Sequence, residues 1–140
     1  MHWPQTQVTT GEAFYEQAAS FQWKQRDSLT RMLVLQGSIP RFLQRFRSVS
    51  TQFRDSSGKL HKAIYYVSPD YLSIGADKNW ARVHITPFLA QELADSLQCF
   101  LPTRKMVDEI YNSAVIKLAP IPLTQNRDST PTFYQHHLAV

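Results

Sequence analysis

The sequence predicts an α+β fold with N-terminal helices, a central antiparallel β-meander of three to four strands, two further helices and an irregular, proline-containing C-terminal tail. Apolar residues recur at three- and four-residue spacing between 10 and 46 and again between 86 and 114, which is the pattern of amphipathic helices. Between 47 and 85 they alternate with polar residues, as in strands that bury one face. Three prolines then interrupt residues 119–140.

The N-terminal helices have recognisable starts and ends. The Thr10 hydroxyl can accept an unpaired N–H and so cap a first helix. A second helix is expected from about Trp23 to Gln36, and Gly37 ends it because glycine adopts the left-handed conformation without a Cβ penalty. Pro40 suits the first turn of a third, short helix, where its missing N–H would have no partner anyway.

Turn residues separate the predicted strands of the meander. Asp55–Lys59 has the composition of a hairpin loop, Pro69-Asp70 marks a second turn and Gly75–Asn79 a third. The predicted strands are 49–54, 60–67, 71–74 and 80–85. The first of them is expected to be half-buried, with its odd-numbered residues facing the core.

Two later helices follow the meander. Thr86-Pro87 and Thr103 each supply a hydroxyl cap at a helix start. The last helix carries an apolar face with a buried Met106-Val107 pair, while Lys105 and Glu109 pair at i, i+4 on its wet side. These helices are expected to complete the core.

Residues 124–140 are predicted to form an irregular tail on a single α+β domain of residues 1–123. The stretch Gln125–Thr130 is polar enough to stay solvated, whereas Phe133 and Tyr134 would expose large apolar surface if left free. We therefore expect the tail to be loosely held, or to pack through these two rings on a second copy or on a missing half of the protein.

Length and composition bound the class of protein. The chain has 140 residues, of which 43% are hydrophobic, as expected for one domain with one core. No run of about 18 apolar residues appears, which excludes a transmembrane helix. The start Met1–Gln5 lacks the features of a secretory signal, so the protein is expected to be cytoplasmic or to have lost its targeting segment.

Cysteine content and charge narrow the chemistry further. Cys99 is the only cysteine, which excludes an intrachain disulfide and a cysteine-based zinc cluster. Its apolar neighbours predict a buried thiol. The net charge of +4 allows an anionic partner such as nucleic acid, an anionic glycan or a membrane surface, but also serves solubility alone.

Several motifs between Arg26 and His136 resemble those of an uncharacterised bacterial protein family. The matching segments are 37–43, 66–75 and 101–108, with shorter matches at 86–87, 90–91, 94–95 and 117–118. Longer members of that family look like exported proteins and continue past the equivalent of 132–136 into a second half that carries several histidines. The resemblance implies that this chain corresponds to the N-terminal half, and it favours an exported or periplasmic location.

Two candidate ligand sites use the helix start at 103 and the meander. Thr103, Arg104 and Lys105 could hold an anion against the unpaired N–H groups of the helix start, although a simple cap and a charge pair explain the same residues. Tyr66 and Trp80 could form an aromatic platform for a glycan, although strands favour aromatic residues in any case.

Histidines form a further candidate site. His136 and His137 are adjacent and point in different directions, so they make a poor metal site, and His84 would join them only through the tertiary fold. Ordinary hydrogen-bonded histidines near a terminus explain the pair as well. The sequence predicts no metal site and no cofactor.

A basic run with interleaved phenylalanines spans the predicted third helix and the first hairpin. Its members are Arg41, Arg45, Arg47, Arg54, Lys59 and Lys62, with Phe42, Phe46 and Phe53. Phosphate contact and base stacking would use such residues. The phenylalanines occupy core-facing positions, however, which favours an ordinary solvated basic face over nucleic-acid binding.

Three functions remain open on these observations. The first is a non-catalytic domain of an exported or cell-envelope protein that binds an anionic or glycan ligand or a partner half. The second is part of a hydrolase that acts on cell-wall material, with His84, His136 or His137 in its site and further residues outside this chain. The third is a small basic nucleic-acid-binding module. Whether the chain is an enzyme is left undecided by the sequence.

Overall fold

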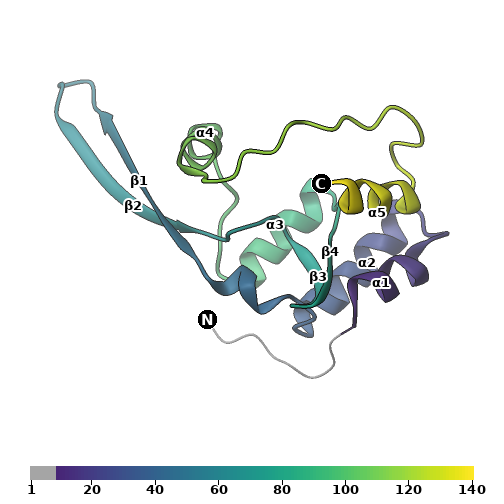
Figure 1. The fold of residues 1–140 in the computed structure, drawn as a ribbon. Coiled ribbons are helices and arrows are strands. Elements are labelled where there is room, and N and C mark those ends of the chain that lie inside the picture. The colour runs from purple at the N-terminus through teal and green to yellow at the C-terminus, as the bar shows by residue number, and fades with distance from the viewer. Residues whose placement is uncertain (1–8) are drawn as a thin grey trace.

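The computed structural model describes residues 9–140 and has an α+β fold: two N-terminal helices, four short antiparallel strands in two hairpins, then three helices (Figure 1). The stretch Met1–Gln5, compared above with a secretory signal, lies outside the described residues. Within residues 9–140, no helix is long and apolar enough to cross a membrane.

The N-terminal helices begin and end close to where the sequence predicts. Helix α1 spans Gly11–Ala18, and the Thr10 hydroxyl caps it by accepting the amide of Ala13 at 3.1 Å. Helix α2 spans Trp23–Leu35, after which Gly37 has φ of 84°. The third helix is only a 3₁₀ turn, η1, over Arg41–Gln44.

The strands form two separate hairpins, so the prediction of one continuous meander is wrong. Strand β1 (Arg47–Arg54) pairs with β2 (Leu60–Val67), and β3 (Ser73–Ala76) pairs with β4 (Asn79–Arg82). The chain after β2 turns away at Pro69, which has no N–H for a ladder. The edge of β3 that faces away from β4 bonds to the loop after α2: the Gly75 amide donates to the Ser38 carbonyl at 3.1 Å.

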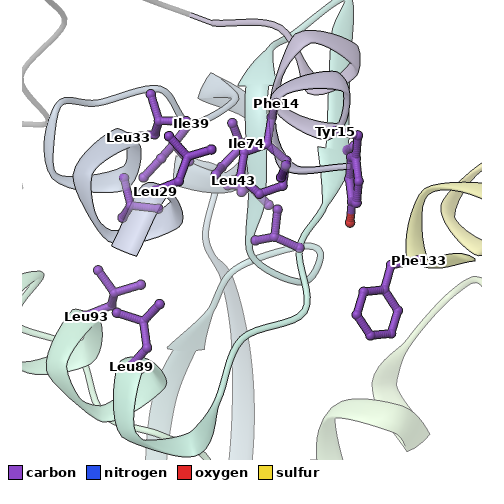
Figure 2. Close-up of a cluster of buried hydrophobic side chains, with 14 residues drawn as sticks. Phe14, Tyr15, Leu29, Leu33, Ile39, Leu43, Ile74, Leu89, Leu93 and Phe133 are labelled. Atoms are coloured by element: carbon purple, nitrogen blue, oxygen red, sulfur yellow. The ribbon is translucent and has the colours of Figure 1, made fainter. Parts of the chain in front are cut away.

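The core lies among α1, α2, the β3–β4 hairpin and the helices α3 (Pro87–Ser96) and α5 (Thr130–Ala139), away from β1 and β2 (Figures 1 and 2). Phe14 and Ile74 are completely buried at its centre. Gly11 allows α1 to approach β4 closely, because a Cβ there would lie 2.4 Å from the strand backbone. Other buried members include Leu29, Leu33, Ile39, Leu43, Leu89 and Leu93.

The later helices are α3 (Pro87–Ser96), α4 (Arg104–Ser113) and α5 (Thr130–Ala139). Thr86 and Thr103 cap α3 and α4 as predicted, accepting the amides of Leu89 and Met106. Helix α4 contributes no buried residue, so the prediction of a buried Met106-Val107 pair is wrong: Val107 is 50% exposed. The helix lies beside the β1–β2 hairpin instead of on the core (Figure 1).

Residues 130–139 are a helix, so the prediction of an irregular C-terminal tail is wrong there. Helix α5 packs on α1 and β4, and Phe133 is buried at 7% exposure in this chain's own core. Pro131 stands in the first turn of α5, where a proline needs no N–H partner. It therefore starts the helix instead of breaking it.

Cys99 is exposed, against the prediction of a buried thiol. Helix α3 ends at Ser96, and Gln98 adopts a positive φ of 52°, so the chain leaves the helix before its apolar spacing reaches the cysteine. The thiol donates to the nearby Leu97 carbonyl at 3.4 Å.

Candidate functional site

The β1–β2 hairpin projects from the body of the molecule (Figure 1). We call residues 45–67 the hairpin arm. Val49 is the only residue of its two strands that is buried. The predicted half-buried strand is thus half-buried only at its base, and Phe53 near the tip is 56% exposed. The arm therefore contributes little to the core, and most of its side chains are accessible to a binding partner.

Helix α4 packs against one face of the arm, at Thr51 and Tyr65. The Glu109 carboxylate accepts the Thr51 hydroxyl at 2.7 Å and the Tyr65 hydroxyl at 3.2 Å, and Lys105 bonds both Thr51 and Glu109. Tyr65 also donates to the Met106 carbonyl at 3.3 Å. The hydrogen bonds to Glu109, first that of Lys105, lower the pKa of its carboxyl. These bonds hold the arm and α4 together as one unit.

The other face of the arm is open to solvent. It consists of the even-numbered residues 48–54 of β1 and 60–66 of β2, and every one of them is exposed. The β1 part is polar, with Ser48, Ser50 and Gln52. The β2 part is largely apolar: Leu60 is 40%, Ile64 63% and Tyr66 68% exposed. Apolar side chains gathered on a projecting surface are typical of a contact site.

The tip of the arm is locally fixed. The Asp55 carboxylate accepts the Ser57 amide at 2.9 Å, the Lys59 amide at 3.1 Å and His61 Nε2 at 2.7 Å. Gly58 takes the positive φ of 82° that the turn needs. Hydrogen bonds from the Ser57 side chain and then His61 lower the pKa of Asp55 to about 2. The loop is thus pre-organised, with its carboxylate already satisfied.

The arm carries the net charge of the protein. Residues 45–67 contain five lysines or arginines and one aspartate. Their excess of four positive charges equals the net charge of the whole chain, so acids and bases balance elsewhere. All five cations are exposed: Arg45, Arg47, Arg54, Lys59 and Lys62. Arg41, the sixth member of the basic run, lies in η1, which directly precedes the arm in the chain.

The residues of the predicted anion and aromatic sites lie on α4, the arm and β4. The Thr103 hydroxyl caps α4, and the exposed Lys105 is bonded to Glu109, whereas Arg104 is exposed beside them. Tyr66 lies on the open face of the arm, whereas Trp80 packs against Phe42 and His137.

The fold brings the three candidate histidines to the docking site of α5. The His84 ring stacks on Phe133 at 4.0 Å and lies 6.4 Å from His136. His136 Nε2 is 2.8 Å from the Ile121 carbonyl. Burial lowers the pKa of His84, with further lowering by His136 and Arg26.

His137 Nδ1 accepts the Arg82 amide at 3.5 Å, and its ring packs on Trp80 at 5.0 Å. Burial and then the Arg82 charge lower its pKa. Among residues 9–140, no group of three or more histidine, cysteine or acidic side chains is placed to hold a metal ion. His84, His136 and His137 thus make contacts around the packing of α5 on the body.

Two buried charged residues of α2, Arg26 and Asp27, were not predicted from the sequence. The Arg26 guanidinium lies 4.9 Å over the Phe133 ring and 3.3 Å from the Thr130 hydroxyl. Asp27 accepts the Thr86 hydroxyl at 2.5 Å. Both charged residues fall one turn before the buried Thr30, and that helical spacing was a signal that could have identified them. They connect α2 to α3 and α5.

Comparison with protein-family models, curated proteins and solved structures finds no match to this chain. The resemblance described from the motifs therefore stays a prediction.

Proposed function

We propose that this chain is a non-catalytic binding domain that holds an anionic macromolecule on its hairpin arm. The observation that carries the proposal is the placement of the whole positive excess of the chain on a projecting hairpin with one open face. Positive potential attracts an anion over roughly 10 Å at about 0.1 M salt and raises its association rate. The arm projects from the body (Figure 1), so a large ligand can reach it without steric hindrance from the rest of the chain.

The local structure of the arm supports binding in a second way. The bonds at Asp55 fix the tip, and those at Glu109 fix the arm to α4. A surface that is ordered before binding loses little conformational freedom when a ligand arrives. Charge then provides attraction, and the exposed Ile64 and Tyr66 provide short-range contact.

A non-catalytic role is favoured because the groups suited to acid–base chemistry have other partners. His84 stacks on Phe133, and His137 accepts the Arg82 amide. His61, the histidine of the arm, is bonded to Asp55 at the tip. These contacts support packing and loop order more directly than they support hydrolysis of cell-wall material.

The experiment compares two variants that lose the same charge from different places. Lys59→Ala with Lys62→Ala removes two cations from the arm; Lys24→Ala with Arg127→Ala removes two exposed cations from the body. Fluorescence anisotropy would follow binding of labelled polyglutamate, heparin and a single-stranded oligonucleotide at several salt concentrations.

We expect at least one polyanion to bind, with affinity that falls as salt rises. The arm variant should weaken binding and flatten the salt dependence, by about 0.7 per lost phosphate contact if the ligand is the single strand. The body variant should bind as the unchanged protein does. The proposal is refuted if no polyanion binds at low salt, or if the two variants weaken binding equally.

A further inference from the structure

We propose that the outer edge of β2 binds an extended acidic segment of another protein, which adds to the hairpin as a third strand. This inference rests on the proposed function of the arm and names its partner. It follows from the backbone, the side chains and the charge of the arm.

The backbone of β2 offers an unused edge. The Asp55 amide donates to the Lys59 carbonyl at 3.1 Å, and bonded pairs alternate along an antiparallel hairpin, so the next bonded pair is Phe53 with His61. The even-numbered residues of both strands therefore turn their N–H and C=O groups outward. Within residues 9–140, no further strand pairs with either edge. Such an edge is a template for another chain.

The side chains favour the edge of β2 over that of β1. The residues whose backbone N–H and C=O groups point away from the partner strand are the even-numbered ones, and their side chains form the open face of the arm. On β1 they are serines, a glutamine and an arginine, whereas on β2 they are Leu60, Lys62, Ile64 and Tyr66. A strand added beside β2 would cover exposed apolar area while it makes backbone bonds. Proteins usually protect open edges with several charges or a bulge, and β2 has only Lys62.

Charge selects the chemistry of the added strand. A second copy of this chain would bring two arms together, each with an excess of four positive charges, and would be repelled. An acidic segment is attracted to Lys59 and Lys62 beside the edge. A nucleic acid is also attracted, but it binds by stacking its bases on aromatic rings and by phosphate contacts. It forms no backbone ladder with a strand edge, and the aliphatic Leu60 and Ile64 offer its bases no stacking surface.

The test uses the full chain and a labelled peptide of alternating glutamate and valine. A second peptide has the same side chains but carries N-methyl groups on alternate residues, which removes the donors of one strand edge and leaves the charge intact. Hydrogen exchange read by NMR would report each amide of the arm. Calorimetry or anisotropy would report affinity.

We expect the alternating peptide to slow exchange at Lys62, Ile64 and Tyr66 and to leave Ser48 and Ser50 unchanged. N-methylation should lower affinity by about tenfold or more, because it removes several backbone bonds. Ile64→Pro removes an outward N–H from β2 without breaking the inner ladder, and should also weaken binding. Its register partner provides the control: Ser50→Pro makes the same change on β1 and should have little effect.

Four outcomes would contradict strand addition, the binding function of the arm or its acidic partner. Equal affinity for both peptides would overturn strand addition, and this comparison needs no protein variant to fold. If polyglutamate or the oligonucleotide binds the arm and the alternating peptide does not, the inference fails while the proposed function stands. If no polyanion binds, both fail. Protection of β2 without peptide, together with dimers in sedimentation, would assign the edge to a second copy and overturn the acidic partner.

Discussion

Helix α5 is part of the core, and the substitution Phe133→Ala tests this most sharply. The ring is 7% exposed, stacks on His84 at 4.0 Å and lies under the Arg26 guanidinium at 4.9 Å. Truncation of a buried phenylalanine costs about 3–5 kcal/mol through lost transfer energy and the cavity left behind. We expect about 3 kcal/mol, the lower end, because a terminal helix can shift to fill part of the space.

Part of this expected loss arises at Arg26. The guanidinium would lose its aromatic contact, which contributes about 1 kcal/mol at a partly desolvated site. Its Nε has no hydrogen-bond partner among residues 9–140. For a domain of this size, about 3 kcal/mol lowers the melting temperature by about 10 °C.

Urea unfolding monitored by circular dichroism would measure the loss in Phe133→Ala. The matched control on the same helix is Leu138→Ala, which truncates a side chain that is 61% exposed and should change stability by less than about 0.5 kcal/mol. A loss below about 1 kcal/mol in Phe133→Ala would refute the reasoning and return the segment to the loosely held tail that the sequence suggested.

Three further predictions concern acid, the thiol and the approach of α1 to β4. The pKa values of His84 and His137 are lowered in the folded protein, so as the pH falls these histidines take up protons in the unfolded chain before they do so in the folded one. Their contribution to the free energy of unfolding is therefore fully present above about pH 6.5 and is lost progressively below it. The urea midpoint should be lower at about pH 5.5 than at about pH 7.5, and an equal or higher midpoint would contradict the burial of these rings. Cys99 should react with a maleimide in the native state, more slowly than free cysteine because partial burial raises the pKa of its thiol; labelling that requires denaturant would contradict its exposure. Gly11→Ala places a Cβ 2.4 Å from the β4 backbone and should cost about 1–3 kcal/mol in urea unfolding, whereas Ser20→Ala at an exposed site should cost almost nothing.

Local chemistry made the helix boundaries predictable. Thr10, Thr86 and Thr103 cap the helices they were expected to cap, and Gly37 has the left-handed conformation that ends α2. The loop at Gly58 likewise lies where its composition placed it. Each of these depends on a few neighbouring residues, which a sequence displays directly.

Long-range packing decided what the sequence did not reveal. A proline can break a helix or stand in its first turn. Pro131 stands in the first turn of α5, and the helix is held in place because Phe133 stacks on the His84 ring. Alternation in β1 predicted a buried face, but that face meets α4 and Glu109 instead of the core. The basic run was found in the sequence, whereas its concentration on one projecting hairpin required the fold.

The central claim is that the hairpin arm binds an anion, and mapping of NMR shifts onto the chain tests it most directly. Polyglutamate would be titrated into isotope-labelled protein at low salt, and the amide shifts followed residue by residue. The account predicts that saturable shifts gather in residues 45–67 and disappear as salt rises. Shifts that gather around the α4 start at Thr103 and Arg104, or around His84 and His136, or no shifts at all, would contradict it.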